Sequence, residues 1–172
     1  MLTWLADLLT LPAMARFVVT YALVWPIAET FHFLGMALLF GTIALLDLRM
    51  LGFAKIIPIE AAHSLVPWGI AGFVTCLVSG LVFVTGHPYG ANAYFVNHAF
   101  LAKMATLMLA GLNVAAFYLT GSSKAALETA PGSEVPRGAK IVAAASLGLW
   151  LLVIYFGRMI MYRAVWQDLL HL

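Results

Sequence analysis

Glu29, His32, Lys103 and Arg158 are four ionisable residues that lie inside segments apolar enough to be buried in a lipid bilayer. An ionisable side chain at the depth of the hydrocarbon costs at least about 2.5 kcal/mol, so it needs either a partner or a function. Glu29 and His32 are three residues apart and therefore share one face of a helix. We expect the four residues to form a site, provided that the elements carrying them bring them together.

The amino-acid composition indicates whether the chain is surrounded by water or by lipid. Hydrophobic residues make up 64% of the 172 residues, charged residues make up 9%, and the mean hydropathy is +1.01. Soluble domains are typically about 45–50% apolar and about 25% charged, so this composition predicts an integral membrane protein. The net charge of +2 gives no sign of a nucleic-acid partner, and the single cysteine, Cys76, excludes an intrachain disulfide.

Four apolar segments are each close to the length of about 20 residues that a helix needs to cross the hydrocarbon. The sequence predicts these spans at about residues 26–48, 67–85, 100–120 and 141–162. Four successive spans predict an all-α, up-and-down four-helix membrane bundle over residues 26–172. Before it, residues 1–25 include Trp4, Asp7 and Pro12 and predict a short amphipathic helix at the membrane interface.

The basic residues predict an orientation. We call face A the membrane face of both termini and of the link 86–99, and face B the opposite face. The link 86–99 holds no Lys or Arg. Four basic residues lie near face A (Arg16, Lys103, Arg158, Arg163) and five near face B (Arg49, Lys55, Lys124, Arg137, Lys140). Because cytoplasmic loops carry an excess of Lys and Arg, we expect face B to be cytoplasmic.

The direction of the spans places several histidines towards face A. The second span ends there just before His87, and the third begins there after His98. Imidazoles from different helices are the usual ligands of haem b in four-helix membrane proteins. We therefore expect His32 to be one axial ligand and His98 or His87 to be the other. Ala28 and Gly35 leave a low surface beside the His32 ring for a flat porphyrin.

The charges near face A leave a place for an anion. Lys103 lies one turn inside the third span, and Arg158 lies near the face A end of the fourth. Glu29 can neutralise only one of them, which leaves one cation for a haem propionate or for a phospholipid headgroup. Glu29 is also expected to tune the His32 ring or to relay a proton.

The same residues also have structural interpretations. His32 can be a bundle histidine paired to Glu29, Lys103 can extend its ammonium to face A, and His87 and His98 can be exposed. Three polar residues are expected to be structural, with a cap or ion pair for Asp47 and Arg49 and an interhelical hydrogen bond for Asn113.

A stripe of small residues predicts one helix contact. Gly72, Cys76 and Gly80 recur at intervals of four and are expected to pack against Ala37 and Gly41 in the first span. Alternatively, the glycines make room for a flat ligand.

The chain resembles a family of uncharacterised four-span bacterial inner-membrane proteins in the runs ETFHFLGMALLFGTIALLDLRMLG, LVPWGIAGF, NHAFLAKM, AGLNVAAF and GRMIMY. This resemblance covers most of residues 26–162, and it implies the bacterial inner membrane. In that membrane a cytoplasmic face B places both termini on the periplasmic side. A more distant similarity of pattern runs to membrane-helical protoporphyrinogen oxidase and to copper-resistance and cytochrome b561-like haem bundles. That similarity implies that His32 is an axial haem ligand and that Lys103 contacts a substrate or a propionate.

Two functions are therefore expected to compete. The first is a haem b protein of the membrane that transfers electrons or handles haem. The second is a structural or accessory subunit of a larger membrane complex, in which Glu29 and Arg158 form an interhelical ion pair. A homo-oligomer is a separate expectation for the assembly. A small-solute transporter is a third possibility, and membrane lipid surrounds the protein in each case.

Overall fold

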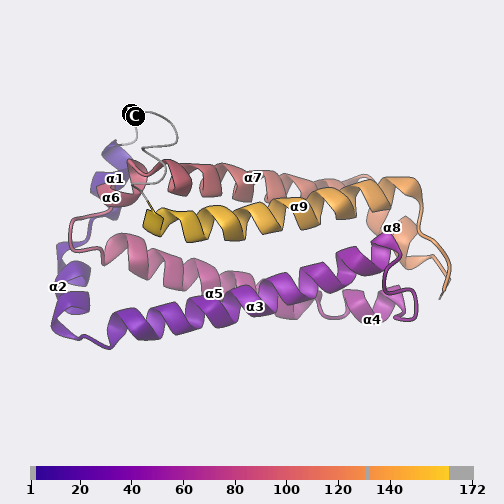
Figure 1. Ribbon diagram of the computed structural model, residues 1–172, viewed down its shortest axis with the longest axis horizontal. Coiled ribbons are helices and arrows are strands. Elements are labelled where there is room, and N and C mark those ends of the chain that lie inside the picture. Colours follow the sequence, from indigo (N-terminus) through magenta and orange to yellow (C-terminus); the bar gives the residue numbers. More distant parts are fainter. Residues whose placement is uncertain (1–2, 131, 163–172) are drawn as a thin grey trace.

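The structure, a computed structural model, describes residues 3–130 and 132–162, and every regular element in those ranges is helical. Four long helices run back and forth along the molecule: α3 (Val24–Leu51), α5 (Val66–Thr85), α7 (His98–Leu119) and α9 (Arg137–Met159) (Figure 1). Each is long and apolar enough to cross a membrane, so the predicted all-α, up-and-down membrane bundle is confirmed. Residues 163–172 of the predicted bundle, Arg163 included, lie outside the described residues.

Local signals set where these helices begin and end. α3 ends at Gly52, whose φ of 98° is a backbone conformation that glycine adopts without strain. α7 begins after Asn97, whose Oδ1 accepts from the backbone N–H groups of Ala99 at 3.0 Å and Phe100 at 3.3 Å. The Asn97 amide also donates to the Ile160 carbonyl at 3.0 Å. This bond ties α7 to the 3-10 turn η1 (Ile160–Tyr162) that follows α9.

The four long helices form two antiparallel pairs that are joined along one seam. α3 packs against α5, α7 packs against α9, and the contact between α3 and α9 joins the two pairs (Figure 1). α5 and α7 follow each other in the chain, but they are not packed together over the residues that the structure describes. The bundle is therefore open along the side between α5 and α7.

Glycines make the contact between α3 and α5 a close one. A Cβ atom added to Gly72 would lie 2.6 Å from the Gly35 carbonyl oxygen and 2.7 Å from the Leu39 backbone nitrogen. The Cys76 thiol continues this stripe and donates to the His32 carbonyl at 3.5 Å. The predicted stripe on α5 is therefore a helix-packing surface.

The predicted partners of this stripe on α3 are wrong. Gly41 is exposed, and nothing lies within 4 Å of a Cβ atom added to it; Ala37 is exposed as well. The stripe meets Gly35 instead, because Gly35 faces α5 and Gly41 points to another side of the same helix. Gly80, the last member of the stripe, lies beside the His32 ring, whose Cε1 is 3.8 Å from an added Cβ atom.

The N-terminal segment, predicted as one helix, forms two: α1 (Thr3–Leu9) and α2 (Pro12–Thr20). α1 packs against the short helix α6 (Asn92–Phe95), and α2 packs against α5 (Figure 1). The Thr10 hydroxyl, between α1 and α2, accepts from the Ala91 backbone N–H at 3.1 Å. The segment therefore lies against the face A end of the bundle, close to the link between α5 and α7.

Two short helices and a buried arginine close the face B end. α4 (Ile59–His63) and α8 (Ser122–Leu127) contact each other, and they pack against α3 and α9 respectively. Arg49 is 1% exposed, and its Nε donates to the Ile57 carbonyl. The predicted cap or interhelical pair of Asp47 and Arg49 is not a pair between the two residues: Arg49 bonds to the Ile57 carbonyl, and Asp47 meets Ser146 of α9.

An ionic cluster links the two helix pairs at face B, and we call it the Glu134 clasp. Lys55 Nζ lies 2.8 Å from Glu134 Oε1, and Lys140 Nζ lies 2.6 Å from Glu134 Oε2. The hydrogen bonds from Lys140 and Lys55 lower the pKa of Glu134 from 4.5 to about 2. The clasp therefore stays ionised at every physiological pH.

We expect the Glu134 clasp to make the free energy of unfolding of the bundle depend on pH in the acidic range. Because the folded-state pKa is below the unfolded one, the stabilisation is complete above pH 4.5 and is lost as the pH falls towards about 2. Thermal unfolding in a neutral detergent should thus separate wild type from Glu134→Gln at neutral pH, and the two should converge in acid. Glu128→Gln, another exposed glutamate near face B, is the control. A separation that persists unchanged in acid would contradict the assignment.

Candidate functional site

The structure brings together one histidine and one lysine of the predicted face A site. His32 Nδ1 lies 2.9 Å from Ser79 Oγ on α5, and the His32 ring meets the Phe83 ring edge-on at 5.4 Å between centroids. Lys103 of α7 is close enough to His32 and to Cys76 for its positive charge to act on both side chains. The cluster thus joins α3, α5 and α7 in the face A half of the bundle.

The other two histidines do not join this cluster. His87 lies in the link after α5, where its Nδ1 accepts from the Tyr89 backbone N–H at 3.3 Å, and partial burial lowers the pKa of its imidazole. The Trp25 ring contacts the His87 ring at 6.4 Å and the Phe83 ring at 5.1 Å, and Phe83 in turn contacts His32. Two aromatic rings therefore connect the two imidazoles. His98, at the start of α7, is exposed.

The remaining charged members of the predicted site point away from it. Glu29 is exposed on α3, and Arg158 is exposed near the end of α9. Arg158 donates to the Tyr162 hydroxyl at 3.2 Å, and its guanidinium lies 5.4 Å from the centre of that ring. The predicted ion pair between Glu29 and Arg158 is wrong, since the described residues contain no such contact.

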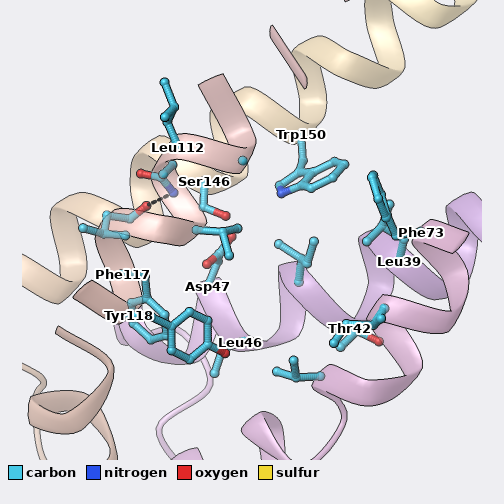
Figure 2. A pocket seen from close by; sticks show the side chains of 18 of the residues that line it. Leu39, Thr42, Leu46, Asp47, Phe73, Leu112, Phe117, Tyr118, Ser146 and Trp150 are labelled. Carbon is cyan, nitrogen blue, oxygen red and sulfur yellow. Dashed lines mark hydrogen bonds between the residues drawn. The ribbon is translucent and has the colours of Figure 1, made fainter. Parts of the chain in front are cut away.

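A large cavity lies in the face B half of the bundle. It has a volume of about 720 Å³, and all four long helices line it. Its walls are almost entirely apolar, with Leu39, Leu46, Phe73 and Leu112 among the side chains that Figure 2 labels. Because α5 and α7 are not packed together, the cavity opens between them, towards the hydrocarbon of a surrounding bilayer. We call it the lateral cavity.

A few polar groups converge on the apolar wall of the lateral cavity. Asp47 of α3 is 4% exposed, and the Ser146 hydroxyl of α9 faces the Asp47 carboxyl (Figure 2). Asp47 Oδ2 has no hydrogen-bond partner among the described residues. Trp150 is 7% exposed, and its indole Nε1 is also without a partner in that part of the chain. Asn113 Nδ2 donates to the Val142 carbonyl at 3.1 Å, which confirms the predicted interhelical hydrogen bond.

The chemistry of the lateral cavity follows from these groups. Buried polar atoms in folded proteins are nearly always paired, and an unpaired one costs about 1–3 kcal/mol. The Asp47 carboxylate is an acceptor and the Trp150 indole is a donor. A molecule that carries both a donor and an acceptor at one end of an apolar body would satisfy both. Within the described ranges no three His, Cys, Asp or Glu residues are grouped for a metal ion.

Sequence reasoning treated Asp47 as structural and did not consider Ser146 and Trp150. One signal was present: Ser146 and Trp150 are four residues apart, on one face of the fourth span. That face meets Asp47 only because α3 packs against α9. The sequence of either span alone does not predict which distant helix it packs against. Comparison of the chain with protein-family models, with curated proteins and with solved structures finds no match.

Proposed function

We propose that this chain is a membrane protein that binds a lipid-soluble molecule in the lateral cavity, between α5 and α7. The observation that carries the proposal is the unpaired Asp47 Oδ2 on a mostly apolar wall. A buried polar group without a partner marks a place where a ligand supplies the partner. The volume of about 720 Å³ lies in the range of about 300–1,000 Å³ that small-molecule sites occupy.

The ligand has an apolar body and a small polar head. A hydroxyl head has the chemistry to pair with either unpaired group, because it can donate to Asp47 Oδ2 and can accept from Trp150 Nε1. The apolar body lies against side chains such as Leu39 and Phe73. Access is from the side, since the opening between α5 and α7 faces the acyl chains of the bilayer and an apolar molecule reaches it without crossing water.

The cellular setting is part of the proposal. The excess of basic residues at face B favours a cytoplasmic face B, with face A and the N-terminus on the periplasmic side of a bacterial inner membrane. The accessory-subunit and transporter roles stay predictions.

Haem b is a second candidate, and one observation supports it. His32 Nδ1 is held by the Ser79 hydroxyl, the kind of outer contact that orients an imidazole for a metal at Nε2. The described residues fit one axial position only, since His98 is exposed and His87 lies beyond the Phe83 and Trp25 rings. Haem binding by His32 and a second histidine therefore stays a prediction.

The test of the main proposal compares the molecules that co-purify with the protein. Wild type, purified in a mild neutral detergent and extracted with organic solvent, should release one apolar compound in near-stoichiometric amount by mass spectrometry. Asp47→Leu removes the polar contact and should retain less than about a tenth of the compound. That tenfold loss corresponds to about 1.4 kcal/mol of binding free energy.

A second pair of variants tests the opening itself. Gly111 of α7 lines the lateral cavity, and nothing lies within 4 Å of a Cβ atom added there, so Gly111→Phe should obstruct the opening without a buried clash. Gly148 of α9 is equally unobstructed but does not line the cavity, so Gly148→Phe is the matched control. Equal retention by wild type, Asp47→Leu and Gly111→Phe would refute the proposal.

A further inference from the structure

Lys103 places a cation among the four long helices in the face A half of the bundle. Its side chain lies across α9, with Nζ 3.6 Å from the position of a Cβ atom added to Gly157. On the other side, the ammonium interacts electrostatically with His32 of α3 and with Cys76 of α5. The Lys103 charge is therefore directed into the bundle and not towards surrounding lipid.

No acidic side chain of the described residues neutralises this charge. Glu29, the acidic residue predicted to do so, is exposed on the outside of α3. Within residues 3–130 and 132–162, Lys103 takes part in no ion pair and no hydrogen bond, and its electrostatic neighbours are His32 and Cys76. The half-buried Lys103 ammonium, a donor of three hydrogen bonds, therefore has no acceptor among the described residues.

A lone charge at this depth is costly, at about 2.5 kcal/mol or more on insertion scales. The C-terminal ends of α5 and α9 and the N-terminal ends of α3 and α7 lie at the same end of the bundle, so their opposite partial charges offset one another. Helix ends do not supply a full counter-charge. An oxyanion does, and it also accepts the free N–H groups.

We infer that Lys103 binds the oxyanion head, a carboxylate or a phosphate, of an amphiphilic molecule in the face A half of the bundle. Gly157 has no side chain and leaves the backbone of α9 bare beside Nζ. Arg158, exposed at the same end, adds positive potential that attracts an anion. This site is separate from the lateral cavity, whose lining on α7 begins at Leu107.

The test measures binding of matched probes to delipidated protein in a neutral detergent by native mass spectrometry. The probes are oleate, oleyl alcohol with the same chain and no charge, and dioleoyl phosphatidylglycerol. Lys103→Met should lower the binding of oleate or of the phospholipid at least tenfold and leave oleyl alcohol unchanged. Lys103→Arg should retain most of the binding, and Lys124→Met, at an exposed lysine of α8, should match wild type.

The pattern of losses identifies the source of the oxyanion. Preferential loss of oleate indicates a free carboxylate, and preferential loss of the phospholipid indicates a headgroup phosphate. A Soret band in protein from cells supplied with a haem precursor, lost in both His32→Ala and Lys103→Met, indicates a haem propionate. The comparison is repeated with Asp168→Asn, which removes the one acidic residue outside the described ranges as an alternative counter-charge.

Two results would overturn the inference. One is equal binding of every anionic probe by wild type and Lys103→Met, with both proteins monodisperse and equally resistant to heat. The other is an equal loss in Lys124→Met, which would show general attraction of anions to a basic protein.

Discussion

Gly72→Ala is expected to separate α3 from α5 and to cause a large loss of stability. The new Cβ would lie 2.6 Å from the Gly35 carbonyl oxygen and 2.7 Å from the Leu39 nitrogen. Both are backbone atoms, so no side chain can rotate away and the two helices must move apart. Overpacking costs about 1–3 kcal/mol where side chains can adjust, and we expect at least the upper value here.

The matched control for this change is Gly41→Ala on α3, where nothing lies within 4 Å of the added atom. Alanine is a better helix former than glycine by about 1 kcal/mol, so this variant should be as stable as wild type or slightly more stable. Unfolding by heat or by a denaturing detergent, followed by circular dichroism, measures both. Equal transition midpoints for the two variants would show that α3 and α5 are not in close contact at Gly72.

Arg49→Ala is expected to give the second large loss, of about 3 kcal/mol, at the face B end. The side chain is 1% exposed, and its Nε donates to the Ile57 carbonyl in the link that leads into α4. Truncation leaves that carbonyl without its donor and leaves a void among the packed ends of α3 and α4. The loss should be seen in the same unfolding measurement.

Two further variants separate the causes of the loss at Arg49. Arg49→Met keeps most of the volume and removes the donor, so it should recover part of the stability. Arg137→Ala removes the same charge from the same membrane face, but Arg137 is exposed. It therefore controls for any effect of charge on orientation, and it should leave the transition near that of wild type. An equal loss in Arg49→Ala and Arg137→Ala would contradict a packing role for Arg49.

The sequence was sufficient to predict which segments cross the membrane, because a run of about 20 apolar residues is a local property. The predicted ends and direction of each span also predict how deep a residue lies in the membrane, because a helix rises by a fixed amount per residue. Asn113 could be assigned a partner on another helix for a related reason: an amide inside an apolar span needs an acceptor.

The sequence did not determine which side of each helix faces which neighbour. Lipid and protein interior are both apolar, so a membrane helix does not carry the hydrophobic stripe that orients a helix in water. His32 and His98 were therefore both predicted to face the site, while His98 is exposed. For the same reason Gly41 was chosen as the contact on α3, although Gly35 makes it. The lateral cavity depends on these unseen orientations in all four helices.

The link at residues 86–97 has a consequence for how the opening between α5 and α7 is set. These two helices are consecutive, so the link is a tether whose contour length limits how far apart their face A ends can stand. The first residue of the link, Gly86, lies against Val18 of α2, and α6, near the end of the link, lies against α1. The two N-terminal helices therefore contact the link at two points. The link and the N-terminal helices thus limit the separation of α5 and α7 at face A, the end of the bundle opposite the lateral cavity.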